Sequence, residues 1–135
     1  MSSSIFVFDT NIMSIYMRAT NNTLSNQIRQ HQKQNLVLPE CVIYEIERGL
    51  HYRDSKRQLT AFYQNVVPLF EIVPIVLQDW QSASKLWAFA RSNGKQLSDI
   101  DFLIAGLTIR LNGILVTDDA DFNVLPVQTT NWLNH

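Results

Sequence analysis

Residues 5–11 read Ile5-Phe6-Val7-Phe8-Asp9-Thr10-Asn11, so four apolar side chains are followed at once by a carboxylate, a hydroxyl and an amide. An apolar run without polar alternation predicts a strand that is covered on both faces, as in the parallel sheet of an α/β protein. Parallel sheets bind ligands beyond the carboxyl ends of their strands, and Asp9 lies at such an end. An Asp in this position can equally begin a turn or cap a helix, so Asp9 alone leaves both interpretations open.

Composition indicates one ordinary globular domain that spans residues 1–135. The chain has 46% apolar and 17% charged residues, with only four Gly and four Pro. The lone Cys41 excludes an internal disulfide, no apolar run approaches the roughly 18 residues of a membrane span, and no signal peptide is recognisable. We therefore expect a cytoplasmic protein with no membrane contact. The net charge of -1 does not indicate binding to nucleic acid, so a nucleic-acid site would have to be a local basic patch.

Strands and helices alternate along the rest of the chain. Apolar runs predict further strands at residues 36–38, 70–73 and 114–116, and the tail around Val127 and Trp132 is compatible with a last one. Helical segments are expected between them, at residues 12–17, 21–33, 40–51, 54–69, 79–92 and 98–111. Trp80 and Trp87 fall on an apolar stripe of the 79–92 helix, which favours a core position for both. The order of elements indicates an α/β fold with a parallel sheet of four or five strands.

Seven of the twelve acidic residues fall at strand ends or near apolar helix faces, namely Asp9, Glu45, Asp99, Asp101, Asp118, Asp119 and Asp121. Right-handed crossovers bring the carboxyl ends of parallel strands to one edge of a sheet, so Asp9 and the 118–121 cluster are expected to converge. Asp119 is the preferred ligand of that cluster, with Asp118 and Asp121 as competitors. Thr117 is placed to orient a metal-bound water.

Two further acids lie on helices. Glu45 borders the apolar face of the 40–51 helix beside Gly49, which costs about 1 kcal/mol of helix propensity and indicates a close approach there. A solvated helix acid is the competing interpretation. Ser98-x-x-Asp101 has the form of a capping box, yet the amino end of a buried helix also suits an ionised ligand. Asp99 faces a different side of that helix and is the second choice as a ligand, after Asp101.

Several carboxylates in one pocket raise each other's pKa unless a cation lies among them. Oxygen ligands favour Mg²⁺ or Mn²⁺, whereas His31, His51 and His135 show no spacing typical of a zinc site. Hard divalent ions of this kind suit phosphate chemistry, which predicts phosphodiester hydrolysis.

With these residues placed, the chain resembles the PIN-domain family over nearly its whole length, and within it the VapC-like toxin ribonucleases of type II toxin-antitoxin systems. The resemblance rests on four motifs that occur in order: Phe8-Asp9-Thr10-Asn11, Glu45-x-x-x-Gly49, Asp101-Phe102-Leu103-Ile104-Ala105-Gly106 and Leu115-Val116-Thr117-Asp118-Asp119-Ala120-Asp121-Phe122. It implies a three-layer α/β/α fold, a Mg²⁺- or Mn²⁺-dependent endoribonuclease, frequent homodimers and a small antitoxin protein as inhibitor. By position it implies Asp9, Glu45, Asp101 and Asp119 as ligands, with Thr10 or Asn11 and Thr117 in support.

Basic residues gather just past the Glu45 helix, where Arg48, His51, Arg53, Lys56 and Arg57 are candidates for RNA phosphates or for a solvated helix end. Met13, Tyr16 and Met17 suit either the core or an antitoxin groove. Two other functions stay open, namely a PIN nuclease of RNA processing without an antitoxin and a catalytically inactive PIN-like protein-binding module.

Overall fold

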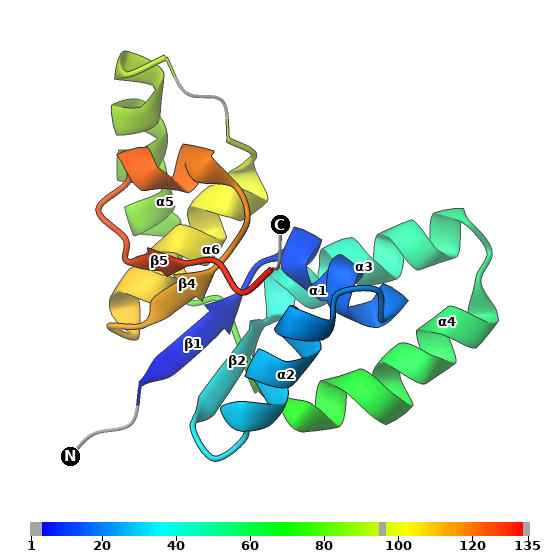
Figure 1. Ribbon diagram of the computed structural model, residues 1–135. Coiled ribbons are helices and arrows are strands. Elements are labelled where there is room, and N and C mark those ends of the chain that lie inside the picture. The colour runs from blue at the N-terminus through cyan, green and yellow to red at the C-terminus, as the bar shows by residue number, and fades with distance from the viewer. Residues whose placement is uncertain (1–3, 95–96, 134–135) are drawn as a thin grey trace.

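A parallel sheet of five strands forms the centre of the structure, a computed structural model that describes residues 4–94 and 97–133 (Figure 1). The strands pair in the order β3-β2-β1-β4-β5. Their bounds are Ile5–Phe8 for β1, Asn35–Pro39 for β2, Glu71–Val73 for β3, Ile114–Val116 for β4 and Thr129–Thr130 for β5. The expected parallel sheet of four or five strands is therefore confirmed, including the short last strand in the tail. The expected boundaries of one domain, residues 1–135, include termini that lie outside the described ranges.

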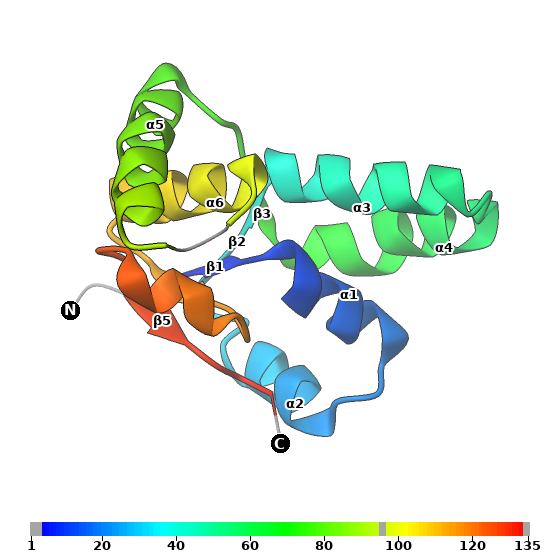
Figure 2. The same ribbon diagram turned by 90° about the horizontal axis from the view of Figure 1, so that it is seen from above.

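Six α-helices surround the sheet within the described ranges: α1 (Thr10–Arg18), α2 (Asn22–Gln30), α3 (Glu40–Tyr52), α4 (Lys56–Ala61), α5 (Leu77–Ser92) and α6 (Asp99–Arg110). Helices α5 and α6 cover one face and α1 and α2 the other, which makes the expected three layers (Figure 2). Helices α3 and α4 lie side by side and extend away from the sheet (Figures 1 and 2).

The helix expected over residues 54–69 is shorter than predicted. It changes after Ala61 into a π-helical turn at Phe62–Val66 and a 3-10 turn at Val67–Leu69. Pro68 stands in the last of these turns. Because proline has no N–H and its ring clashes with the preceding turn, an α-helix cannot continue through this position.

Strand β1 is the middle of the sheet, and its side chains explain why the sequence forms a strand there. Val7 and Phe8 have no exposed surface. Val7 pairs with Val37 of β2 on one side and with Leu115 of β4 on the other. From β1 the strand order runs through β2 and β3 on one side and through β4 and β5 on the other. The carboxyl end of β1 therefore lies where the order reverses, which is the usual position of a ligand site in an open α/β sheet.

The expected core positions of Trp80 and Trp87 are wrong, because these side chains are 57% and 46% exposed. The face of α5 that packs on α6 carries small residues instead. A Cβ atom on Gly106 would lie 3.1 Å from the Asp79 carbonyl oxygen, so the two helices are in close contact there. Ala83 is buried in this contact and the larger indole rings lie outside it.

The tail packs an aromatic side chain against β1, the middle strand of the sheet, as expected. Trp132 is 6% exposed, its ring stacks on His31 at 4.6 Å between centroids, and it contacts Phe6 and Phe8 of β1. No helix in the described part of the chain has the length and apolar character needed to cross a membrane.

Candidate functional site

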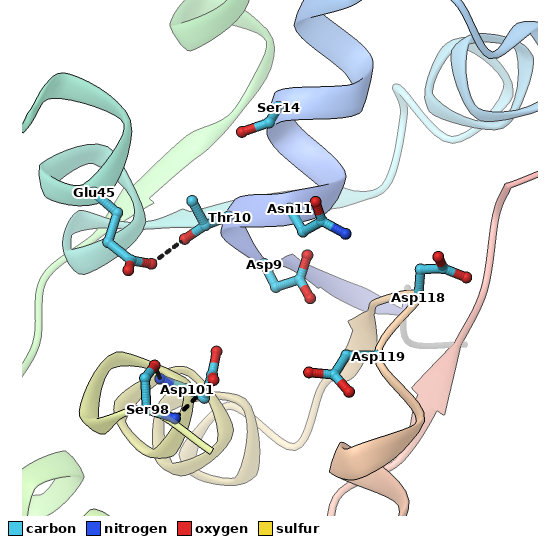
Figure 3. Close-up of a pocket in the computed structure, with 9 residues that line it drawn as sticks. All are labelled: Asp9, Thr10, Asn11, Ser14, Glu45, Ser98, Asp101, Asp118 and Asp119. Carbon is cyan, nitrogen blue, oxygen red and sulfur yellow. Dashed lines mark hydrogen bonds between the residues drawn. The ribbon is translucent and has the colours of Figure 1, made fainter. Parts of the chain in front are cut away.

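A pocket of about 550 Å³ opens at the carboxyl edge of the sheet, and its lining is mostly polar and acidic (Figure 3). Its lining comes from the start of α1, the middle of α3, the start of α6 and the loop after β4: Asp9, Thr10, Asn11, Ser14, Glu45, Ser98, Asp101, Asp118 and Asp119. All four acids ranked first from the sequence are in this set. Figure 3 shows Asp9, Asp101 and Asp119 around a common space, with Glu45 turned toward Thr10.

Asp9 is the most buried of these acids, with 4% of its surface exposed. It caps α1, because its Oδ1 accepts a hydrogen bond of 2.8 Å from the Ile12 N–H. Burial raises the pKa of Asp9 from 3.8 to about 6, the bonds from Thr117 and Ile12 lower it, and the charges of Asp101 and Asp119 raise it. The capping role and the candidate ligand role therefore coincide in one side chain.

Thr117 connects the two strand ends. Its hydroxyl donates a bond of 2.5 Å to Asp9 Oδ2 and accepts one of 3.0 Å from the Asp119 N–H. The expected role of Thr117 in orienting a metal-bound water stays a prediction. The pairing of Phe8 with Val116 brings Asp9 directly beside the Thr117 hydroxyl, which explains their hydrogen bond.

Glu45 is held from two sides. Its Oε1 accepts a hydrogen bond of 2.5 Å from the Thr10 hydroxyl, and its Oε2 lies 3.3 Å from Arg48 Nη2. The Arg48 guanidinium also lies over the Tyr44 ring, 5.1 Å from its centroid. Glu45 is thus a partly buried acid with 18% of its side chain exposed, and the solvated helix acid weighed from the sequence is not what is observed.

Asp101 forms the capping box that the sequence predicted. Its Oδ2 accepts from the Ser98 N–H at 3.0 Å, and its own N–H donates to the Ser98 hydroxyl at 3.2 Å. Burial raises the pKa of Asp101, the bonds from Ser98 lower it, and the charges of Glu45 and Asp119 raise it. The Asp101 carboxylate therefore caps α6 and lines the pocket at the same time.

The remaining candidate acids are less central. Asp118 lines the pocket, but its Oδ1 accepts a bond of 2.7 Å from Asn131. Asp121 donates its N–H to Asp119 Oδ1 and is absent from the described pocket lining. Asp99 lines a different hollow, beside Trp80 and Trp87 between α5 and α6, so the pocket does not include it.

The oxygen atoms of the pocket acids are the donor type that divalent cations such as Mg²⁺ and Mn²⁺ prefer. Four carboxylates supply hard oxygen ligands. Burial raises the pKa of Asp9 and of Asp101, the charges of neighbouring acids raise it further, and a bound cation would offset both effects. In the part of the chain that the structure describes, no three His, Cys, Asp or Glu side chains are already close enough to hold one ion. The oxygen donors suit such an ion in kind, whereas their present positions do not form a ligand cage, and Glu45 is hydrogen-bonded to Thr10. His135, excluded from a zinc site on sequence grounds, lies outside the described residues.

Of the expected basic residues, Arg48 contacts Glu45 and Arg53 lines an adjoining groove, whereas Lys56 and Arg57 are exposed on α4 and line neither cavity. Met13 is fully buried, while Met17 lines the same groove as Arg53. The sequence did not identify Ser14 as a pocket residue. Its only local signal is its place one turn after Thr10, which puts both on one side of α1.

Comparisons with known proteins agree with this architecture. A family model described as PIN domain matches residues 6–127. Among solved structures, VapBC2 from Rickettsia felis, bound to a DNA fragment from its promoter, superposes with a TM-score of 0.86 at 21% identity, covering 95% of this chain and 98% of that one. FitAcB from Neisseria gonorrhoeae gives 0.81 at 19% identity over 94% and 97%.

Mycobacterium tuberculosis VapC20, described as a sarcin-ricin loop cleaving toxin, gives a TM-score of 0.70 at 13% identity over 90% and 95% of the two chains. No match was found among curated proteins. At these identities the structures establish a shared fold, and the family model matches most of the chain.

Proposed function

Because the chain belongs to the PIN domain family, we propose that it is a divalent-metal-dependent endoribonuclease that hydrolyses RNA phosphodiester bonds. The observation that carries the proposal is the convergence of Asp9, Glu45, Asp101 and Asp119 around one pocket of about 550 Å³. These residues come from four separate segments, and burial raises the pKa of Asp9 to about 6. Three of the four acids are buried or partly buried, and such a concentration of negative charge destabilises the fold unless a bound cation offsets it, which is typical of a functional site.

The proposed cofactor is Mg²⁺ or Mn²⁺, which Asp9, Glu45, Asp101 and Asp119 would hold. When bound, such an ion stabilises negative charge on a phosphate and activates a water molecule for attack. Ile12 and Thr117 fix both oxygens of Asp9, so this carboxylate keeps one orientation. The Ser98 cap does the same for one oxygen of Asp101.

We further propose that the protein is the toxin of a toxin-antitoxin pair, with a small antitoxin protein as partner, and that it is a cytoplasmic homodimer. The support is the shared fold with proteins described as VapBC complexes from Rickettsia felis and Salmonella typhimurium. A PIN nuclease of RNA processing without an antitoxin and an inactive protein-binding module remain the alternatives.

Cleavage of a labelled RNA by the purified full-length protein tests the nuclease. We expect cleavage with Mg²⁺ or Mn²⁺, none in EDTA, and none in Asp9→Asn. Asp54→Asn is the matched control, because Asp54 is exposed, lies outside the pocket lining and has a φ of 51° that Asn adopts readily. Undiminished cleavage in EDTA would contradict the proposed metal dependence. Undiminished cleavage by Asp9→Asn would contradict the proposed active site.

The antitoxin has a separate test, since cleavage alone does not distinguish a toxin from a processing enzyme. We expect that the protein expressed with its neighbouring genes co-purifies with a small protein in stoichiometric amount and is inhibited by it. A fully active nuclease with no such partner would support the processing role instead.

A further inference from the structure

The acidic pocket is lined by carboxylates, hydroxyl groups and one amide, and no aromatic side chain belongs to its lining within the described residues (Figure 3). Proteins that hold a single strand of nucleic acid by its bases stack those bases on aromatic rings. A pocket without rings suits the sugar–phosphate backbone instead. We therefore expect the phosphates and ribose hydroxyls of an RNA strand, rather than its bases, to lie against this lining.

Among the described residues, three hydroxyl groups line the pocket, and two of them have partners within the protein. The Thr10 hydroxyl donates to Glu45 Oε1 at 2.5 Å. The Ser98 hydroxyl accepts from the Asp101 N–H at 3.2 Å. The third belongs to Ser14, a half-buried residue of α1 whose hydroxyl forms no hydrogen bond with any residue that the structure describes. This hydroxyl is therefore available to a ligand.

The charge of the pocket indicates which part of the backbone Ser14 meets. A phosphate is an anion, so it lies with the cation that the acids are proposed to bind rather than against the acids themselves. Ser14 lies one turn after Thr10 on α1, and Figure 3 shows it across the pocket from Asp101. A neutral side chain in this position suits the neutral group that adjoins each phosphate of RNA, which is the ribose 2′-hydroxyl.

We propose that the Ser14 hydroxyl forms a hydrogen bond with the 2′-hydroxyl of a nucleotide that flanks the scissile phosphate, and that this bond distinguishes RNA from DNA. A hydroxyl group both donates and accepts, so either partner supplies the proton. The 2′-hydroxyl is the group by which a protein tells RNA from DNA at a given site. This inference rests on the proposed ribonuclease function and adds to it the residue that recognises the sugar.

Cleavage of matched substrates by the full-length protein tests this contact. The cleavage site of the wild type is first mapped on a labelled single-stranded RNA. Two oligonucleotides of the same sequence then carry one 2′-deoxynucleotide each, on either side of the mapped phosphate. A hydrogen bond between neutral groups contributes about two- to tenfold, so Ser14→Ala and one of the deoxy substrates should each lower kcat/KM by such a factor. Combined, they should lower it no further, because both changes remove the same bond.

Ser25→Ala is the matched control, because Ser25 is a half-buried serine of helix α2 that lies outside the pocket lining. It should cleave all three substrates as the wild type does. Ser14→Thr retains a hydroxyl and should keep most of the preference for ribose. Mn²⁺ affinity, measured by titration calorimetry, should be equal in Ser14→Ala and the wild type, since the proposed contact is with the sugar. Thermal unfolding of each variant checks the fold.

Three results would overturn the inference alone, provided that the wild type cleaves RNA. They are wild-type kinetics in Ser14→Ala, effects of Ser14→Ala and of both deoxy substitutions that multiply, and weaker Mn²⁺ binding by Ser14→Ala, which would place the hydroxyl at the ion. Complete loss of cleavage with a deoxynucleotide on the 5′ side would indicate that the 2′-hydroxyl is the nucleophile. That result would overturn the proposed metal-dependent hydrolysis, and this inference with it.

Discussion

The hydroxyl of Thr117 donates a hydrogen bond of 2.5 Å to Oδ2 of Asp9, although 108 positions of sequence separate the two residues. The bond joins the ends of the two neighbouring strands β1 and β4. It lowers the pKa of Asp9, which burial raises to about 6, so Thr117 helps to keep a buried carboxylate ionised near neutral pH.

Removal of this bond should move the pH dependence of cleavage. In Thr117→Val the pKa of Asp9 rises further, so the acidic limb of the pH-rate profile shifts to higher pH and cleavage at pH 6 falls by about tenfold or more. Thr129→Val, on β5, is the control and should leave the limb in place. An unchanged limb in Thr117→Val would mean that Asp9 ionisation does not limit the reaction.

Asp9 should also make the metal-free protein less stable as the pH rises. Its pKa is about 6 in the folded state and 3.8 ordinarily, so the folded state binds more protons between these values. The stabilising contribution is complete below pH 3.8 and is lost as the pH rises through 6. At 1.36 kcal/mol per pKa unit, the loss is at most about 3 kcal/mol.

Asp9→Asn removes this dependence and should therefore unfold at a higher temperature than the wild type in EDTA at pH 7.5. Thermal unfolding of both proteins between pH 4 and 8 checks the sign. If the difference in unfolding temperature between Asp9→Asn and the wild type became smaller as the pH rises, the expected ionisation of Asp9 would be contradicted.

Glu45→Gln and Asp101→Asn should each reduce RNA cleavage by about 100-fold or more, because each removes negative charge from the proposed metal site. Circular dichroism should show an intact fold. Asp99→Asn is the matched control for Asp101, since it lies two residues away on α6 and lines a different hollow. Equal losses in Asp99→Asn and Asp101→Asn would point to damage of the helix start rather than of the site.

Arg48→Gln should strengthen metal binding. Arg48 lies 3.3 Å from the Glu45 carboxylate, and removal of this competing cation frees an oxygen for the ion. Since an exposed ion pair is weak, the gain in Mn²⁺ affinity by titration calorimetry should stay below about tenfold. Arg29→Gln, on α2, should bind Mn²⁺ as the wild type does, and weaker binding by Arg48→Gln would contradict the competition.

Arg110→Met should destabilise the fold without changing the chemistry. Arg110 donates to Asp79 at 2.8 Å and 3.0 Å, and Asp79 has no exposed surface. The substitution therefore leaves a buried carboxylate without its ion-pair partner, with the Val76 N–H still donating to it. We expect a loss of about 3–5 kcal/mol in urea unfolding. The double variant with Asp79→Leu should recover part of it, and failure to do so would indicate that Arg110 acts through its packing.

The sequence predicted the sheet and the convergence of the acids because both follow from local patterns. Apolar runs identify the strands, and parallel strands place Asp9 and Asp119 at one edge. Ser98-x-x-Asp101 identified a cap that the structure confirms.

Other features depend on how helices pack, and helical periodicity does not determine this. The stripe that contains Trp80 and Trp87 is regular, yet the contact of Gly106 with α5 selects the small residues as the buried face. Arg18 had no local signal either. It becomes part of a groove only because α1 packs beside α3.

The adjacency of β1 and β4 has a consequence for biosynthesis. Asp9 and Glu45 are made early, whereas Thr117 and Asp119 follow only after β4, the neighbour that completes the edge beside β1. A nascent chain still attached to the ribosome before that point lacks one wall of the acidic pocket. If the protein is the ribonuclease proposed above, its active site would therefore stay incomplete beside the RNA of the ribosome until that wall has been synthesised.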